Sequence, residues 1–250
     1  MRQARVIIHA NADVLASAVA ARLAVRLIDA QAEHGSASVV LTGGRIAEKI
    51  YTALAEAPVS DAVAWDHVDF WWGDERFLPS GHPDRNETQI RSALLDKLPL
   101  ATDRVHPMPA SDEPDGDDPE AGAIRYAEAL ATAAAGHGEL PRFDVVLLGI
   151  GEDGHVASVF PNHPLVDPSR PVSAVHDSPK PPPIRTTLTL DALNSAHDVW
   201  ILGSGAEKAD AVGRALAGAN PYEVPAAGVR GTRCTLWLLD QAAAAGMTHQ

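Results

Sequence analysis

The chain has 250 residues, 46% hydrophobic and 21% charged, a composition typical of a globular protein that can bury a large core. Its formal net charge of −13 argues against nucleic acid or an anionic membrane as the main partner, and it makes any local cluster of cations informative. The only cysteine, Cys234, excludes an internal disulfide and favours a reducing compartment, so we expect a cytoplasmic protein.

Short apolar runs alternate with helical patterns along most of the chain. The first run, RVIIHA, predicts a strand that leads into an amphipathic helix over about residues 12–31, which is not the pattern of a secretory signal. The run SASVVLTGG precedes a predicted helix at about 46–57, and VDFWWGDER precedes one that begins near Asn86. No apolar run is long enough to span a bilayer.

The second half of the chain continues the alternation. An acidic segment at 107–122 predicts a solvated loop, and YAEALATAAA predicts a helix before the strand FDVVLLG. A proline-stiffened loop enters the strand RTTLTL, and the run DVWILGSG leads into a helix at about 206–218 before the last strand, CTLWLLD. This order predicts a single α/β domain over residues 1–250, an open, mostly parallel Rossmann-like sheet with helices on both faces.

The segment GIGEDGHVASVFP, residues 149–161, contains a complete G-x-G-x-x-G after a predicted strand. A dinucleotide site would also need a full helix after the glycines, and Pro161 comes too soon for one. Glu152 and Asp153 stand where a pyrophosphate needs bare amides, and residues 166–175 show no second strand ending in a ribose-binding acid. The loop therefore predicts another kind of site.

Polar residues follow three of the predicted strands, as TGG, GDER and GIGEDGH, and ligands of open α/β sheets bind at the carboxyl ends of strands. His155 is the best candidate for a general base because imidazole titrates near neutral pH, and Asp153 could orient its ring. The chain has no G-x-S-x-G, and Cys234 lies in a strand pattern, so an activated water is favoured over a covalent nucleophile. It has no H-E-x-x-H and no paired cysteines, so we expect no metal.

Several residues could bind an anion. Asp74 and Arg76 could form a simple surface ion pair, or Arg76 could stabilise an oxyanion or a phosphate. Thr42, Gly43 and Gly44 offer backbone amides before a helix, with Arg45 beside them. Lys180 and Arg185 are the only cations of the proline-rich loop, where stiff prolines favour a held phosphate site.

Several long motifs together resemble a known family. The loop GIGEDGHVASVFP closely resembles the GxGxDGHTASLFP motif of 6-phosphogluconolactonases, WGDERFLPSGHPDRN resembles their DER…H…SN segment, and PKPPPIRTTLTL resembles PKPPxxRiTLT. With LTGG and GSGAEKA in the family's order, the resemblance covers nearly the whole chain. It implies hydrolysis of 6-phosphoglucono-1,5-lactone to 6-phosphogluconate in the oxidative pentose phosphate pathway, without a cofactor. It also implies that His155 is the base, that Lys180 and Arg185 bind the phosphate, and that Asn86 lies in the substrate site.

The chain departs from the family pattern at two places. Arg45 and Ile46 follow TGG where Ser or Thr and then Pro are usual, and Arg85 replaces the usual Ser before Asn86. With these changes, the sequence does not decide which residues contact the phosphate.

Two other functions remain as alternatives. The related amino-sugar-phosphate isomerases and deaminases have GHIAFNEP, in which an acid completes a proton relay; Phe160 stands in its place here, which favours lactone hydrolysis. A non-catalytic sugar-phosphate sensor ranks third, because no helix-turn-helix is appended. We expect a monomer whose partner is a small sugar-phosphate lactone.

Overall fold

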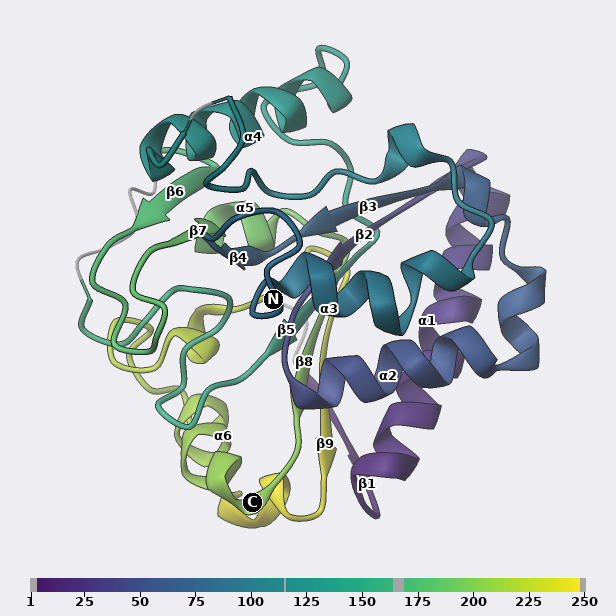
Figure 1. Ribbon diagram of the computed structural model, residues 1–250. Coiled ribbons are helices and arrows are strands. Elements are labelled where there is room, and N and C mark those ends of the chain that lie inside the picture. The colour runs from purple at the N-terminus through teal and green to yellow at the C-terminus, as the bar shows by residue number, and fades with distance from the viewer. Residues whose placement is uncertain (1–3, 115, 164–168, 248–250) are drawn as a thin grey trace.

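The centre of the computed structural model is an open, six-stranded parallel sheet with the strand order β1-β9-β8-β5-β2-β3 (Figure 1). The structure describes residues 4–114, 116–163 and 169–247. Strands β2 and β5 lie inside the sheet and are almost entirely buried, which explains their unbroken apolar sequences. The strands are β1 (Arg5–His9), β2 (Ala37–Leu41), β3 (Val68–Trp72), β5 (Val145–Gly149), β8 (Asp198–Gly203) and β9 (Cys234–Asp240).

Helices flank this sheet on both sides, so the predicted mostly parallel α/β fold is confirmed. Helix α1 (Ala12–His34) packs against α2 (Arg45–Glu56) on one side, and α6 (Ala209–Leu216) lies on the other (Figure 1). The Asn11 side chain caps α1 by accepting hydrogen bonds from two backbone amides, and Gly35 ends the helix in a left-handed conformation. The remaining helices are α3 (Asn86–Ala93), α4 (Pro119–Ala133) and α5 (Leu190–Asn194).

A second, antiparallel sheet has the order β4-β7-β6 and corrects the expected layout. The chain leaves the parallel sheet at Gly73, and GDER follows β3 as predicted, but Asp74–Arg76 form a further strand, β4, which the sequence patterns did not predict. Strand β4 pairs with β7 (Arg185–Leu188), which pairs with β6 (Val172–Val175). The sequence patterns did not predict β6. It belongs to the antiparallel sheet, so it does not restore a dinucleotide fold, and no helix follows β5 before Pro161.

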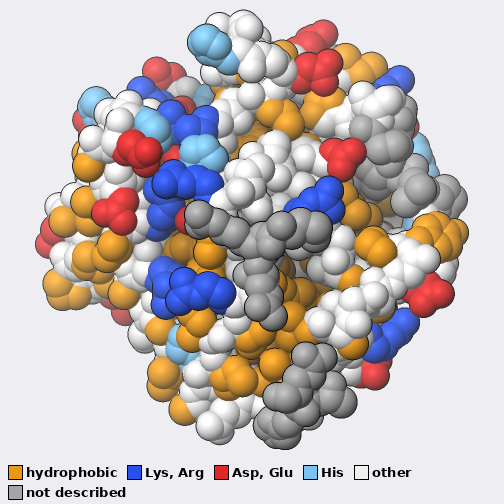
Figure 2. Space-filling view, turned by 180° about the vertical axis from the view of Figure 1, so that it is seen from behind, with side chains coloured by type: hydrophobic (Ala, Val, Ile, Leu, Met, Phe, Trp, Pro, Cys, Tyr) orange, Lys and Arg blue, Asp and Glu red, His pale blue; other side chains and the backbone are white. Residues whose placement is uncertain are grey.

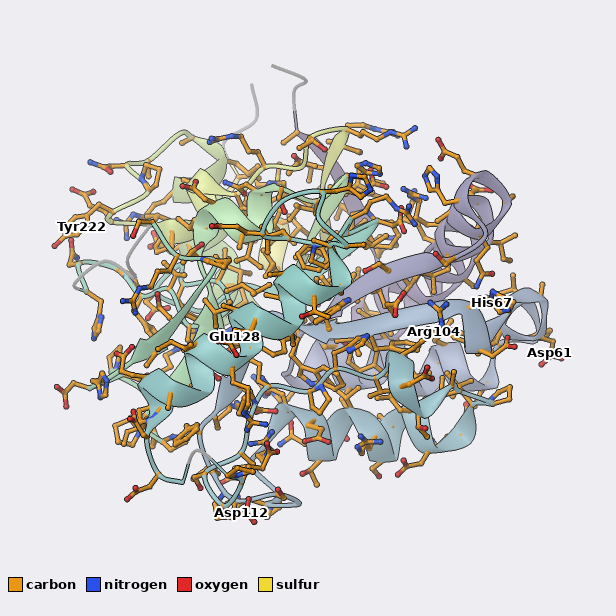
Figure 3. All side chains as sticks on the ribbon, turned by 90° about the horizontal axis from the view of Figure 1, so that it is seen from above. Asp61, His67, Arg104, Asp112, Glu128 and Tyr222 are labelled. Atoms are coloured by element: carbon orange, nitrogen blue, oxygen red, sulfur yellow. The ribbon has the colours of Figure 1, made fainter. Side chains whose placement is uncertain are left out.

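The acidic segment is shorter as a loop than we expected, because α4 already begins at Pro119. Asp118 caps that helix by accepting hydrogen bonds from two backbone amides. Asp112 lies at the periphery of the molecule (Figure 3) and accepts two hydrogen bonds of 2.8 Å from Ser80. These bonds keep the pKa of the Asp112 carboxyl below its usual value.

The surface is mixed in charge. On the face seen in Figure 2, basic, acidic and apolar side chains are interspersed. Among the residues that the structure describes, no helix combines the length and the hydropathy needed to cross a membrane.

Candidate active site

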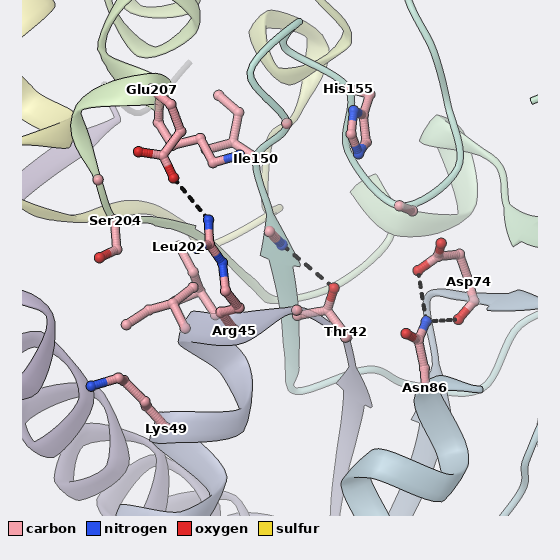
Figure 4. A pocket seen from close by; sticks show the side chains of 18 of the residues that line it. Thr42, Arg45, Lys49, Asp74, Asn86, Ile150, His155, Leu202, Ser204 and Glu207 are labelled. Atoms are coloured by element: carbon pink, nitrogen blue, oxygen red, sulfur yellow. Dashed lines mark hydrogen bonds and ion pairs between the residues drawn. The ribbon is translucent and has the colours of Figure 1, made fainter. Parts of the chain in front are cut away.

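A cavity of about 580 Å³ opens at the carboxyl ends of the parallel strands (Figure 4). The three turns that the sequence singled out, after β2, β3 and β5, all contribute to it. Of the predicted site residues, Asp153 and Lys180 do not line it. The predicted residues that do are Thr42, Gly43, Gly44, Arg45, Asp74, Arg76, Asn86, His155 and Arg185.

His155 and Asp153 form a close pair in the turn after β5. The ring Nδ1 lies 2.6 Å from Asp153 Oδ1, and Asp153 also accepts a hydrogen bond from the His155 backbone amide. Burial opposes ionisation of Asp153, but the hydrogen bonds and charge of His155, helped by Lys180, keep the pKa of its carboxyl below its usual value. An ionised Asp153 holds the proton on Nδ1, so Nε2 remains free to accept one.

Glycine at position 151 allows this pair to pack against the backbone. A Cβ at Gly151 would lie 2.0 Å from His155 Nδ1 and 2.4 Å from Asp153 Oδ1, well inside van der Waals contact. The Gly151 amide donates to the His155 carbonyl at 2.9 Å and closes the loop. The glycines of this motif therefore shape a histidine turn and do not cradle a pyrophosphate.

The turn after β2 is held by Tyr51 of α2. The Tyr51 hydroxyl accepts a hydrogen bond from the Thr42 amide and donates one to the Thr42 carbonyl. A Cβ at Gly43 would lie 1.9 Å from Asn86 Oδ1, so glycine here leaves room for the Asn86 side chain at the start of α3. Arg45 forms a 3.0 Å ion pair with Glu207 and its side chain is 88% exposed (Figure 4).

Two arginines from the small sheet face each other across the β4–β7 pair. Arg76 and Arg185 are register partners, and Asp74 Oδ2 lies 3.9 Å from Arg185 Nη1. Burial lowers the pKa of the Arg185 guanidinium, Asp74 opposes this shift, and the charge of Arg76 adds to it. The Arg185 guanidinium also donates to the carbonyls of Lys180, Pro181 and Pro182. Arg185 therefore holds the proline-rich loop as well as lining the cavity.

Lys208, at the start of α6, lines the cavity and was not among the predicted site residues. Burial lowers the pKa of its ammonium group, Glu152 opposes the shift, and the nearby charge of Lys180 adds to it. Lys180 lies outside the cavity lining, with Nζ 3.9 Å from Asp153 Oδ1. The two lysines thus flank the His155 turn. A cation just after a strand end, as in GDER, was the signal in the sequence.

Arg85 and Phe160 clarify two features of the sequence. Arg85 is fully buried and bonds to the Met108 carbonyl at 2.7 Å, so this departure from the family pattern adds no cation to the cavity. Phe160 is buried with its ring 4.8 Å from that of His155, and the Arg185 guanidinium lies 5.7 Å from the Phe160 ring centre. An apolar ring therefore supports the histidine where a relay acid would stand. No three metal-binding side chains converge in the described part of the chain.

An open α/β sheet with a histidine–aspartate pair and several cations around a cavity at its carboxyl edge defines a protein that acts on small anionic molecules. Comparison with known proteins makes this specific. Residues 10–237 match the family described as glucosamine-6-phosphate isomerases/6-phosphogluconolactonase, and the chain belongs to that family.

Individual relatives agree with this assignment. A 6-phosphogluconolactonase of Streptomyces coelicolor is 55% identical over 96% of this chain and 93% of its own length. The solved 6-phosphogluconolactonase of Trypanosoma brucei has a TM-score of 0.81 and 31% identity, covering 99% of this chain and 100% of that one. A solved glucosamine-6-phosphate deaminase has a TM-score of 0.78 at 22% identity over 97% and 99% of the two chains, which shows the shared fold alone.

Proposed function

We propose that this protein hydrolyses 6-phospho-D-glucono-1,5-lactone to 6-phosphogluconate, a step of the oxidative pentose phosphate pathway, without a cofactor. The observation that carries the proposal is the Asp153–His155 pair beside a cavity lined by Arg76 and Arg185. The similarity to 6-phosphogluconolactonases over nearly the whole chain supports the same substrate.

In the proposed reaction, His155 Nε2 takes a proton from a water as that water attacks the lactone carbonyl carbon. The carbonyl oxygen becomes an oxyanion, which Arg76 stabilises. Arg76 lines the cavity, and its Nη1 donates to the Asp84 carbonyl at 2.8 Å. The tetrahedral intermediate then expels the ring oxygen, which receives the proton from His155. Asp153 stabilises the imidazolium between the two proton transfers.

The deaminase alternative is disfavoured by the surroundings of His155. Moving a proton between neighbouring carbons needs a base, an acid and a relay that resets them. Phe160 packs against the ring and can provide none of these functions. No observation favours a sensor function. A protein that only binds a sugar phosphate does not need a histidine such as His155, which a carboxylate orients as a base.

The deciding experiment measures the hydrolysis of freshly made 6-phosphogluconolactone against its spontaneous rate, with glucosamine 6-phosphate run in parallel. We expect rapid lactone hydrolysis, no ammonia, and no loss of activity with a chelator. Ammonia release at a rate comparable to lactone hydrolysis would overturn the proposal, and a chelation loss that zinc restores would make the histidines metal ligands.

We further propose that Lys180 and Arg185 bind the phosphate, with Lys208 as a third cation. Lys180→Ala, Arg185→Ala and Lys208→Ala should each weaken binding of the phosphorylated lactone by roughly 10- to 100-fold, because a charge-assisted bond contributes about 1.5–3 kcal/mol. Unphosphorylated gluconolactone, the control substrate, should hardly be affected. Lys208 is the cleanest probe, since Arg185 also holds three loop carbonyls and Lys180 lies 3.9 Å from Asp153. Equal losses on both substrates would show that these residues shape the cavity instead.

We also propose a cytoplasmic monomer. The single cysteine and the pathway support the location, and size-exclusion chromatography with light scattering tests the monomer.

A further inference from the structure

Glu75 is a buried residue beside the candidate active site, and the proposed reaction does not use its carboxylate. Its Oε1 accepts hydrogen bonds from the Arg76 amide at 2.8 Å and from the Asn86 amide at 2.7 Å. Its Oε2 accepts a third from the Glu87 amide at 2.8 Å. Arg85, the N-cap residue of α3, makes no side-chain capping bond, so Glu75 caps this helix from β4.

Arg85 supplies the opposite charge. Its Nη2 lies 3.8 Å from Glu75 Oε2, and both side chains are fully buried. The guanidinium is anchored by bonds to the carbonyls of Leu78, Met108 and Pro109. Arg85 occupies a position at which the protein's family usually has serine. In this chain it acts as a counter-ion to Glu75.

The two amides that share Glu75 Oε1 belong to residues that line the cavity, Arg76 and Asn86. The Asn86 side chain in turn donates to the Asp74 carbonyl at 2.9 Å and abuts Gly43. We propose that Glu75 is a positioning residue for lactone hydrolysis, which holds β4 against the start of α3 so that Arg76 and Asn86 face the cavity. This inference rests on the proposed function.

The ionisation of Glu75 gives the role a pH signature. Burial raises the pKa of its carboxyl to about 7, against the opposing effects of Arg85 and the three amides. Protonation removes the negative charge and turns one acceptor oxygen into an O–H donor that faces backbone amides, so the arrangement weakens as the pH falls below about 7. The charged and titratable groups around Glu75 are Asp74, Arg76, Arg85, Glu87, Tyr126 and Arg185.

The first test compares Glu75→Gln with Glu87→Gln. Glu87 also contacts Arg85, with Oε2 3.2 Å from its Nη2, but accepts no bond from the Arg76 or Asn86 amide, so it is the matched control. We expect Glu75→Gln to lower kcat by roughly 10- to 100-fold, since small misplacements at a reacting centre have effects of this size. KM should change by about threefold or less, because Arg76 acts on charge that develops after binding. The Glu87→Gln variant should keep its kcat.

The second test is the pH profile of kcat in Arg85→Gln. Loss of the counter-ion should move the acid limb upward by about one pH unit or more, with activity recovering at higher pH. Glu75→Gln should not recover. Protonation of His155 contributes to the acid limb of every variant, so the shift between variants is the measured quantity.

If the variant in one of these tests does not fold, the other test still decides whether the inference holds. A Glu75→Gln kcat within about twofold of wild type, equal losses in Glu75→Gln and Glu87→Gln, or an unshifted limb in Arg85→Gln would overturn the inference. Failure of the proposed function would be distinct, because it would already show as absent lactone hydrolysis in the wild type.

Discussion

Replacing His155 with alanine should reduce kcat for 6-phosphogluconolactone by about 10²- to 10⁴-fold, the usual contribution of a positioned general base. The effect should fall on kcat because the ring contacts the attacking water, while the cations that bind the phosphate remain. The fold should persist, since the His155 side chain bonds only to Asp153 among the contacts described and packs against Phe160 at the cavity edge.

His163→Ala is the matched control for this measurement. His163 lies in the same segment, with its ring 6.3 Å from that of Phe160, but it does not line the cavity. Its removal should leave kcat nearly unchanged. Near-wild-type turnover by His155→Ala, with a normal circular dichroism spectrum, would contradict the assignment of the base.

Asp153→Asn should lower kcat by roughly 10²- to 10⁴-fold as well, because it disables the same base. An asparagine amide can donate to His155 Nδ1, which places the ring proton on Nε2 and removes the acceptor that water needs. Glu152→Gln, at the neighbouring exposed acid, is the control and should retain activity. A change in melting temperature without a change in rate would mean that Asp153 only caps its own turn.

The same variant has a stability signature with a definite sign. The pKa of Asp153 is lowered in the folded protein, so its carboxylate stabilises the fold above the ordinary aspartate pKa of about 3.9. This contribution is lost as the pH falls through the lowered value. The melting temperature of Asp153→Asn should therefore fall below that of the wild type at neutral pH, and the difference should shrink in acid.

The sequence alone was sufficient to predict those features of the structure whose physical cause is local. Unbroken apolar runs predicted the buried parallel strands, and the first helix begins at Ala12, as predicted. Pro161 and the acids between the glycines excluded a dinucleotide loop. The pairing of Asp153 with His155 could also be predicted, because residues two apart in one tight turn must lie close together.

Only the tertiary structure decided the features that depend on strand partners and burial. Strand β4 is three residues long, and its departure from the parallel sheet depends on pairing with β7, far along the chain. That pairing places Arg185 opposite Arg76. The start of α6 likewise brings Lys208 to the cavity. Its position after the end of a strand was visible in the sequence, but its place in the cavity lining was not.

The roles of the charged residues show the same division. Arg45 and Arg85 are both departures from the family pattern, and of the two only Arg45 was predicted to be a site residue. The fold exposes the first and pairs it with Glu207, and it buries the second opposite Glu75. A side chain's charge is set by its residue type, but its partner and its solvation are set by long-range packing. The counter-ion role that we propose for Arg85 could therefore be inferred only from the folded molecule.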